Sequence, residues 1–245
     1  MDVLVFRGAD GLDIEELSEV QCIAVIDVLR GSSTTVAALA AGAPLVIPVA
    51  KLEEALELAR RLGAILAGER GGRKLPFCDL GNSPAEMLRA KPSRPVVLTT
   101  TNFTRYVELA KGGGRTVIAA CFLNLSAAAE YLRRFERVAL IACDEAGVPS
   151  PADRACAERL RAMLLEDAEA PSPEELVRLR KGRDAAELIE LGASEDVELC
   201  LGRVDMFNLV PVLRPGDLGF RAELTSRQSR VLDRERTEAE GWIRS

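Results

Sequence analysis

The sequence predicts an α/β fold in which a mostly parallel sheet is covered by helices on both faces. Short β-branched runs alternate with alanine- and leucine-rich amphipathic stretches from residue 22 to residue 143, which is the pattern of repeated βαβ units. The strand segments are almost continuously apolar, as expected when helices lie on both sides of a sheet. A chain of 245 residues with 48% hydrophobic and 29% charged residues can bury such a core.

The first half of this alternation ends at Glu69. Its strands and helices are expected in the order strand 22–28, helix 33–41, strand 45–49, helix 52–62 and strand 64–68. The second half follows a short helix that opens in GNSPAEM. Its elements are expected as strand 95–101, helix 104–111, strand 116–121, helix 125–135 and strand 137–143.

The two halves resemble each other in sequence. Residues 36–49 are similar to residues 106–121, and the helix over 52–62 is similar to the helix over 125–135. We therefore infer two related βαβαβ halves, at about 22–69 and 95–145, within one unit that spans residues 1–220.

The rest of the chain is less regular. Residues 150–168 are predicted to form one long helix, residues 174–192 a second helical stretch, and residues 197–213 strand-like structure. Residues 221–245 are charged and have little apolar periodicity, which predicts a loose C-terminal tail.

The composition excludes several classes of function. A net charge of −6 and the lack of a Lys/Arg-rich block argue against nucleic-acid binding. No apolar run approaches the roughly 20 residues that span a bilayer, and the N-terminus lacks the pattern of a signal peptide, so we expect a cytoplasmic protein without membrane contact. The chain has no histidine, which excludes Ser-His-Asp triads, Cys-His pairs and sites that need an imidazole ligand. The six cysteines form no CxxC motif and are expected to be reduced core residues.

The motif DVLRGSST combines groups that bind a phosphoryl anion. Ligands of open α/β sheets bind at the carboxyl ends of strands, and Asp27 ends a predicted strand there. Arg30 follows in the turn, and Ser33 and Thr34 stand at a helix start. Backbone N–H groups, hydroxyls and a guanidinium suit a phosphate, whereas a capped helix with Arg30 on the surface is the structural alternative.

Two further motifs follow the predicted strand over 64–68. Glu69 ends it, and the glycines at 71–72 permit a turn close to a ligand. In DLGNSPAE, Ser83 stands at the position of a helix N-cap, with proline and glutamate after it as in a capping box. Asp79 and Asn82 are not needed for that cap, so they are candidate ligands.

The motif TTTNFTR repeats the design of a strand end before a helix. Asn102 is a plausible N-cap, Thr104 a donor, and Arg105 lies one turn into the helix. Strand propensity accounts for the threonines but not for Asn102 and Arg105. We therefore expect these residues to bind a phosphate or sulfonate.

Acidic residues also follow the last predicted strand of the second half. Asp153 fits the third position of a helix capped by Ser150, whereas Asp144 and Glu145 have no such structural explanation. Magnesium prefers carboxylate oxygens, and one or two acids suffice when waters and a substrate phosphate complete its shell.

Taken in order, these motifs and residues 143–156 resemble the 2-phosphosulfolactate phosphatase family of coenzyme M biosynthesis, over about residues 20–212. The resemblance implies an αβα fold, dependence on Mg²⁺, hydrolysis of a phosphomonoester on a small acidic sulfonate, and a homodimer. The residues on matching positions are Asp27, Arg30, Glu69, Asp79, Asn82, Ser83, Asn102, Thr104, Arg105 and Asp153.

The chain also departs from the family pattern. Phe103 replaces the glycine of the usual TTNGTR, Ala152 stands at a position that is usually acidic, and a histidine often seen farther on is missing. Phe103, Ala152 and the extra acids between residues 143 and 158 motivate an alternative, a catalytically impaired member that acts as an anion-binding or scaffold protein. A nucleotide-binding function is disfavoured because neither GxxxxGK[ST] nor GxGxxG occurs.

The resulting hypothesis assigns three groups of residues. Catalysis falls to Asp27, Arg30, Glu69 and Arg105, and some of Asp27, Glu69, Asp79 and Asp153 hold Mg²⁺. The substrate-binding residues are Ser33, Thr34, Asn82, Ser83, Asn102 and Thr104. Either a carboxylate orients water, or Asp27 forms an aspartyl-phosphate.

Overall fold

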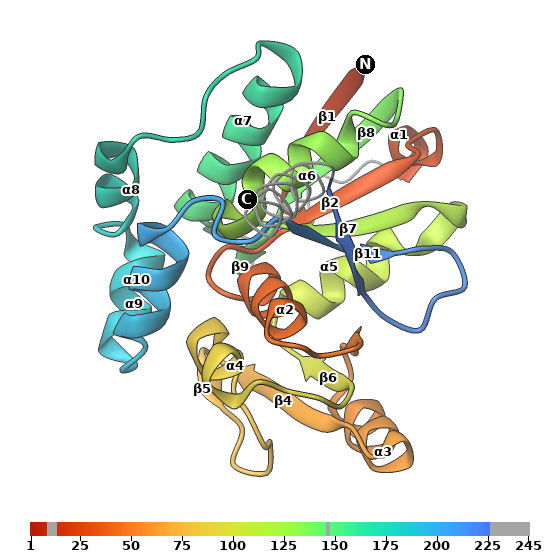
Figure 1. Ribbon diagram of the computed structural model, residues 1–245, viewed down its shortest axis with the longest axis vertical. Coiled ribbons are helices and arrows are strands. Elements are labelled where there is room, and N and C mark those ends of the chain that lie inside the picture. The colour runs from red at the N-terminus through yellow and green to blue at the C-terminus, as the bar shows by residue number, and fades with distance from the viewer. Residues whose placement is uncertain (9–13, 146–147, 226–245) are drawn as a thin grey trace, which may run out of the picture.

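The protein forms two main sheets, each with helices on both faces (Figure 1), and a small two-stranded sheet of β9 (Asp144–Glu145) and β10 (Val148–Pro149). The architecture is seen in a computed structural model, which describes residues 1–8, 14–145 and 148–225. The strand order is β1-β8-β2-β7-β11-β12 in the larger sheet and β3-β6-β4-β5 in the smaller.

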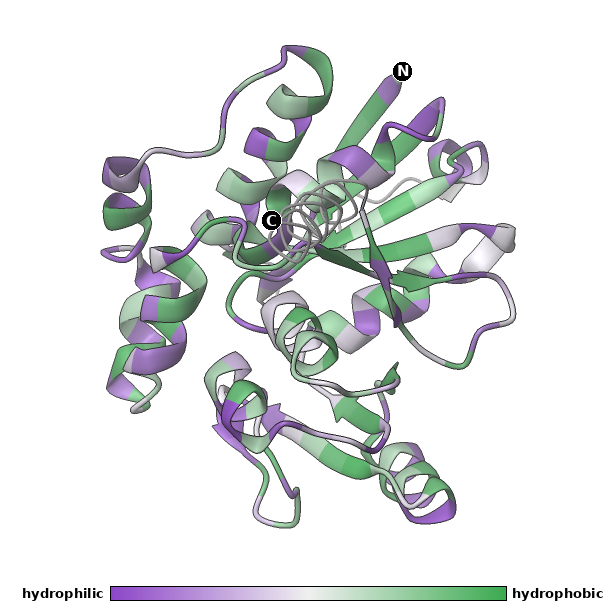
Figure 2. Ribbon diagram, in the orientation of Figure 1, coloured by the Kyte–Doolittle hydropathy of each residue, from purple (hydrophilic) through white to green (hydrophobic). Residues whose placement is uncertain are grey.

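Four parallel strands form most of the larger sheet: β1 (Asp2–Arg7), β8 (Arg137–Ala142), β2 (Cys22–Ile26) and β7 (Thr116–Ala120). Two antiparallel strands, β11 (Leu209–Leu213) and β12 (Arg221–Leu224), extend it beyond β7. All residues of β2 and β11 are buried, and the central strands are mostly hydrophobic (Figure 2). Burial of such apolar strands is the main favourable contribution to folding.

The smaller sheet is built in the same way. Its parallel strands are β3 (Val46–Pro48), β6 (Val96–Thr99) and β4 (Ile65–Arg70), and β5 (Arg73–Lys74) pairs antiparallel with β4. Val46 and Phe220 exchange two backbone hydrogen bonds, of 3.0 and 2.7 Å, and so join the smaller sheet to the segment between β11 and β12.

The helices form three layers around the sheets. Helices α2 (Gly31–Ala40) and α5 (Phe103–Ala110) contact strands of both sheets and lie between them. Helices α6 (Leu125–Leu132) and α7 (Pro151–Leu165) cover the outer face of the larger sheet, and α3 (Leu52–Leu62) covers the smaller. The predicted α/β class is confirmed. The expected single sheet is instead two sheets, because periodicity identifies a buried strand but not its neighbour.

The halves of the sequence repeat are interleaved in space. Each contributes three strands and two helices in βαβαβ order. Strand β2, the first of its half, lies between β7 and β8 of the other half, and β6 lies between β3 and β4. Strands β2 and β4 are the first and third strands of one half, and β6 and β8 are the first and third strands of the other. The site residues near the ends of these four strands therefore stand at matching places in the two halves.

The remaining helices differ in part from the sequence prediction. The helical stretch over 174–192 is two helices, α8 (Pro173–Leu179) and α9 (Arg183–Glu190), with Gly182 as N-cap of the second. Residues 197–202, predicted as strand-like, belong to α10 (Ser194–Gly202), where Val197, Cys200 and Leu201 are buried at helical spacing. Strand β1 and α1 (Ile14–Ser18) were not predicted.

The predicted tail begins inside the fold. Residues 221–224 form β12, which pairs with β11, so they are not part of a loose segment. The sequence predicted a tail here because β12 is a short edge strand with charged and mostly exposed residues, which lack the apolar pattern of a buried strand. The residues of this prediction from 226 to 245 lie outside the described residues.

Other sequence expectations agree with the structure. All six cysteines are buried and unpaired. None of the helices within the described ranges is long and apolar enough to cross a membrane. Helix α4 (Pro84–Ala90) begins after Ser83, whose hydroxyl accepts the Glu86 N–H at 3.1 Å, so the predicted cap is confirmed.

Phe103 lies in the helix layer between the sheets. Its side chain is fully buried and stacks on Phe220, with 6.2 Å between ring centroids. A Cβ atom on Gly31 would lie 2.3 Å from the Phe103 Cβ, so the glycine is needed for this close packing. The aromatic side chain therefore contributes to the core.

Candidate active site

A cleft of about 140 Å³ opens where the carboxyl ends of four strands meet. Such a volume suits a ligand smaller than a typical drug molecule. The residues after β2, β4, β6 and β8 line it, with α9 as a further wall. The residues that line it include Asp27, Arg30, Glu69, Asn82, Asn102, Cys143, Asp144, Asp153, Arg183, Asp184, Leu188 and Leu191.

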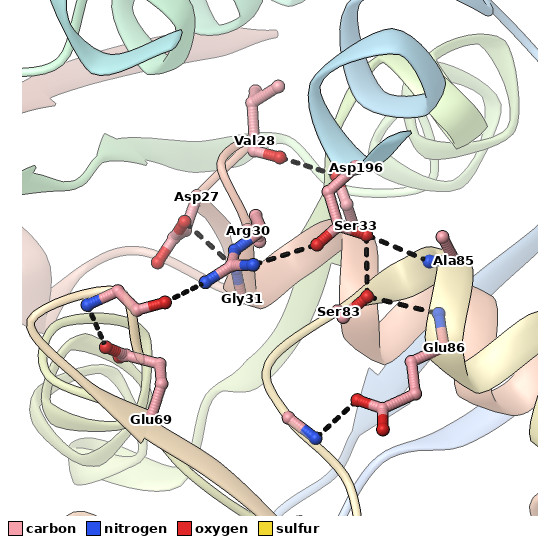
Figure 3. A network of polar contacts seen from close by, with 12 residues as sticks. Asp27, Val28, Arg30, Gly31, Ser33, Glu69, Ser83, Ala85, Glu86 and Asp196 are labelled. Carbon is pink, nitrogen blue, oxygen red and sulfur yellow. Dashed lines mark hydrogen bonds and ion pairs between the residues drawn. The ribbon is translucent and has the colours of Figure 1, made fainter. Parts of the chain in front are cut away.

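Asp27 stands directly after β2, at the N-terminus of α2. One of its carboxylate oxygens accepts the Gly31 N–H at 3.0 Å, and its backbone carbonyl accepts the Ser32 N–H at 2.9 Å. The first N–H groups of α2 thus bond to Asp27 itself, not to a free anion site as the sequence suggested. They hold a buried carboxylate in the cleft (Figure 3).

Arg30 is buried and held from two sides. Its Nη1 donates to an Asp196 carboxylate oxygen at 2.8 Å, and its Nη2 donates to the Gly72 carbonyl at 2.7 Å. The Asp196 side chain also accepts hydrogen bonds from the Ser83 hydroxyl at 2.7 Å and from the Ala85 N–H at 3.2 Å. Figure 3 shows this network, which fixes the guanidinium group at the edge of the cleft.

Glu69 connects two loops of the cleft. Its carboxylate accepts the Gly72 and Thr101 N–H groups, each at 2.7 Å, and the Thr101 hydroxyl at 3.2 Å. A carboxylate has about four lone-pair positions, so these three bonds occupy most of them. The residue is therefore suited to positioning the loops after β4 and β6.

Asp153 of α7 lies beside Asp27 and Val28, although Val28 is 125 residues away in the sequence. Its carboxylate accepts the Val28 N–H at 2.7 Å, and its own N–H donates to the Ser150 hydroxyl at 3.2 Å. Burial, and then the negative charge of Asp27, raise the pKa of Asp153 well above its usual value. Two acids held together in this way favour a cation or a shared proton between them.

Two more residues of the β8 end line the cleft. The Asp144 carboxylate accepts the Tyr106 hydroxyl at 2.6 Å, and burial and then this hydrogen bond raise the pKa of Tyr106. Burial and the charge of Asp27 raise the pKa of Cys143 well above its usual value. Cys143 is therefore a neutral thiol and a poor nucleophile.

Three predicted substrate-binding residues lie at the cleft or beside it. Asn82 and Asn102 line it, and the Asn82 side-chain oxygen is buried without a hydrogen-bond partner. Asn102 does not cap α5 with its side chain; the Thr100 hydroxyl accepts the Thr104 N–H instead, at 3.2 Å. Ser83 lines an adjoining groove, next to Arg30 and Asp196.

Five predicted site residues lie away from the cleft. The Ser33 hydroxyl donates to the Val28 carbonyl at 2.8 Å and the Thr104 hydroxyl to the Thr100 carbonyl at 3.0 Å. Thr34 is buried within α2. Asp79 and Arg105 are exposed, and the Asp79 carboxylate accepts the Leu66 N–H at 2.9 Å. The structure therefore does not place these five side chains among the cleft-lining residues.

The structure also adds residues that the sequence analysis did not select. Asp196 of α10 and both Arg183 and Asp184 of α9 come from the helices after the repeat. No strand-end rule points to them. The one available signal was helical spacing in residues 194–202, which would have placed Asp196 next to a buried helix face.

The cleft is more acidic than basic. Among its described lining residues are six carboxylates, of Asp27, Glu69, Asp144, Asp153, Asp184 and Glu187, and two guanidinium groups, of Arg30 and Arg183. Within the described ranges, no three His, Cys, Asp or Glu side chains form a complete metal cluster. A metal ion would therefore need water or substrate oxygens beside Asp27 and Asp153, which is how magnesium is usually bound.

Comparison with known proteins identifies a family for this chain. The sequence profile described as 2-phosphosulpholactate phosphatase matches residues 10–216. A Thermotoga petrophila protein named "Probable 2-phosphosulfolactate phosphatase" is 40% identical over 214 residues, which cover 81% of this chain and 92% of the relative. The Methanothermobacter thermautotrophicus protein named "2-phosphosulfolactate phosphatase" is 36% identical over 214 residues, with 83% and 91% covered. This chain belongs to the 2-phosphosulfolactate phosphatase family.

Proposed function

We propose that this protein hydrolyses 2-phosphosulfolactate to sulfolactate and inorganic phosphate, and that it requires Mg²⁺. Family membership supports the reaction class, and the charge of the cleft supports the metal. The substrate carries a phosphate, a carboxylate and a sulfonate, so it is strongly anionic. A cleft with six carboxylates and two guanidinium groups needs an added cation to bind it.

The metal fits best beside Asp27 and Asp153. Asp153 is buried next to the Asp27 charge, and the repulsion between the two carboxylates would be relieved by a divalent cation. When bound there, Mg²⁺ would neutralise charge on the phosphate oxygens. Glu69 contributes less directly, because three hydrogen bonds already occupy its carboxylate.

The side chains around these two acids have separate roles. Asp27 faces the phosphorus, either as nucleophile or as the base that orients water. Arg30, fixed by Asp196, stabilises charge on the phosphate. Asn82 and Asn102 supply neutral polar groups that orient the substrate without adding charge.

The departures from the family pattern do not obstruct this cleft. The side chains of Phe103 and Ala152 are fully buried and do not line it. The alternative of an impaired binding or scaffold protein was motivated in part by these two residues, and it loses that part of its support. The homodimer and the cytoplasmic location stay predictions.

The first test is phosphate release from purified protein. With 2-phosphosulfolactate and Mg²⁺, we expect phosphate release that slows at least about tenfold after chelation and returns when Mg²⁺ is added, since such an ion supplies several kcal/mol of transition-state stabilisation. A panel of other phosphorylated hydroxy acids serves for comparison. If no phosphate is released from any of them while they still raise the melting temperature, the protein is a binding protein.

A second prediction concerns pH and uses Asp153. The pKa of Asp153 is higher in the folded protein than in the unfolded chain, so the folded state holds the proton more tightly. The free energy of unfolding therefore falls as the pH rises from the unfolded-state pKa to the folded-state pKa. Mg²⁺ competes with the proton for this site. The rise in melting temperature caused by Mg²⁺ should therefore be small near the usual Asp pKa of 3.8 and grow as the pH increases. Asp153→Asn should flatten this dependence, whereas an unchanged slope in the variant would remove Asp153 from the metal site.

A further inference from the structure

We propose that Arg183 determines specificity by binding the sulfonate of the substrate. The inference rests on the proposed function and assigns a role to a helix outside the sequence repeat. Asp27, Arg30 and Asp153 stand around the proposed phosphate position, whereas α9 supplies the wall that faces the rest of the substrate.

Two guanidinium groups line the cleft within the described residues, and that of Arg183 is the one not assigned to the phosphate. The other one among the described lining residues, that of Arg30, is bound by Asp196 and the Gly72 carbonyl, and its side chain is only 7% exposed. The Arg183 side chain is 49% exposed. Its Nε lies 3.8 Å from a Glu187 carboxylate oxygen, an ion pair that is too long for a hydrogen bond. An anion that enters the cleft can therefore engage it.

The first turn of α9 is tied to the residues around the reacting centre. The Asp184 carboxylate accepts the Ser150 hydroxyl at 2.8 Å and the Ala152 N–H at 3.3 Å. The same Ser150 hydroxyl accepts the Asp153 N–H and so caps α7. The hydrogen bonds thus connect the backbone that carries Arg183 to the start of α7, where Asp153 stands.

A second contact anchors the other end of α9 and the turn after it. A Cβ atom on Gly72 would lie 2.6 Å from a Leu191 methyl and 3.6 Å from a Leu188 methyl, so these leucines pack closely over the 71–72 turn. The Gly72 carbonyl is the one that binds Arg30. Both ends of the α9 wall therefore contact elements that hold the proposed phosphate site, which fixes Arg183 relative to it.

The positions of the anionic groups in the substrate favour the sulfonate as the partner of Arg183. The carboxylate is attached to the carbon that carries the phosphate, whereas the sulfonate is one methylene farther away. With the phosphate at Asp27 and Asp153, the half-exposed Arg183 on the outer wall is suited to the more distant group. A sulfonate stays ionised across physiological pH and matches the planar fork of a guanidinium.

The test compares Arg183→Gln with the unchanged protein on two substrates. 2-Phosphosulfolactate carries the sulfonate on its methylene carbon, and 2-phospholactate has a hydrogen in place of that sulfonate. We expect kcat/KM for the sulfonated substrate to fall roughly 10- to 100-fold, mainly through KM, as for the loss of one charge-assisted hydrogen bond. The value for 2-phospholactate should change by less than about twofold. Arg183→Lys should retain part of the discrimination, because it keeps the charge without the fork.

Arg203→Gln is the matched control, since this exposed arginine follows α10 and does not line the cleft. Arg203→Gln should leave kcat/KM unchanged for both substrates. An equal loss on both substrates in Arg183→Gln would overturn the proposal by showing a structural or phosphate-binding role. Unchanged kinetics on both would overturn it as well.

A binding measurement separates this proposal from the proposed function. Sulfolactate should raise the melting temperature of the unchanged protein more than lactate does, and Arg183→Gln should lose this difference. Suppose that neither phosphorylated substrate is hydrolysed, but sulfolactate still raises the melting temperature more than lactate does and this effect depends on Arg183. The proposed reaction is then wrong, and the sulfonate site is supported. If phosphate is released but sulfolactate and lactate act alike, the sulfonate site is wrong.

Discussion

Replacement of Asp27 by asparagine is expected to lower kcat for 2-phosphosulfolactate by roughly 10²- to 10⁴-fold, the usual range for a general base. Asparagine keeps an oxygen that can accept the Gly31 N–H, so the start of α2 should be preserved. What is lost is the negative charge next to Asp153. The melting temperature should change little without metal, and its rise with Mg²⁺ should shrink.

Asp79→Asn is the control for this prediction. The sequence placed Asp79 among the metal ligands, but in the structure it is exposed and binds the Leu66 N–H, a bond that asparagine can also make. We expect its kcat to stay within about twofold of the unchanged protein. If Asp27→Asn keeps more than half of the activity, or Asp79→Asn loses most of it, the assignment of the reacting centre is wrong.

The same residue separates the two chemical routes. If Asp27 is the nucleophile, rapid acid quenching with substrate labelled in the phosphate should leave label on the protein, and mapping should place it on Asp27. If Asp27 orients water, no label should be retained at any reaction time. The neutral thiol of Cys143 is not expected to carry label, because burial raises its pKa.

The strand-end residues could be predicted because that prediction needs only the order of the elements. Asp27 follows β2 and Glu69 lies near the end of β4, and parallel strands end at a common edge whichever neighbours they have. The rule succeeded here even though the strands belong to two sheets. It succeeded because β2 and β8 of the larger sheet and β4 and β6 of the smaller sheet end at the same cleft.

The residues on helices were harder to predict. Asn102 precedes α5 and lines the cleft, whereas Arg105 is exposed and Thr104 is buried. Each step along a helix turns the side chain by about 100°, so a motif such as TTTNFTR cannot say which of its members face the ligand. The hydroxyls of Ser33 and Thr104 bond instead to nearby backbone carbonyls, which is a common local alternative.

The residues from α9 and α10 could not be found from the repeat. Arg183 and Asp196 reach the site through packing between segments more than 100 residues apart, as the Arg30–Asp196 contact illustrates with its separation of 166 residues. A sequence pattern with local periodicity carries no information on such contacts. The contribution of α9 to the cleft and the support of Arg30 by Asp196 are therefore visible only in the three-dimensional structure.

Replacement of Asp196 by alanine is expected to destabilise the protein by about 3–5 kcal/mol, because it leaves the buried Arg30 charge without its partner. The Ser83 hydroxyl and the Ala85 N–H would lose an acceptor as well. For a chain of this length, that loss corresponds to a melting temperature lower by roughly 6–20 °C. The activity of the folded fraction should also fall, because Arg30 would no longer be fixed at the phosphate.

Glu195, which precedes Asp196 in the sequence, provides the control for this substitution. Glu195 forms an ion pair with Arg89 in which both side chains are largely exposed, at 66% and 60%, and such pairs contribute about 0–1 kcal/mol. Glu195→Ala should therefore leave the melting temperature and kcat almost unchanged. Arg30→Met combined with Asp196→Leu should regain most of the stability but none of the activity, since apolar residues can replace a buried ion pair but cannot bind phosphate. If Asp196→Ala is no less stable than Glu195→Ala, the buried pair does not hold the cleft together.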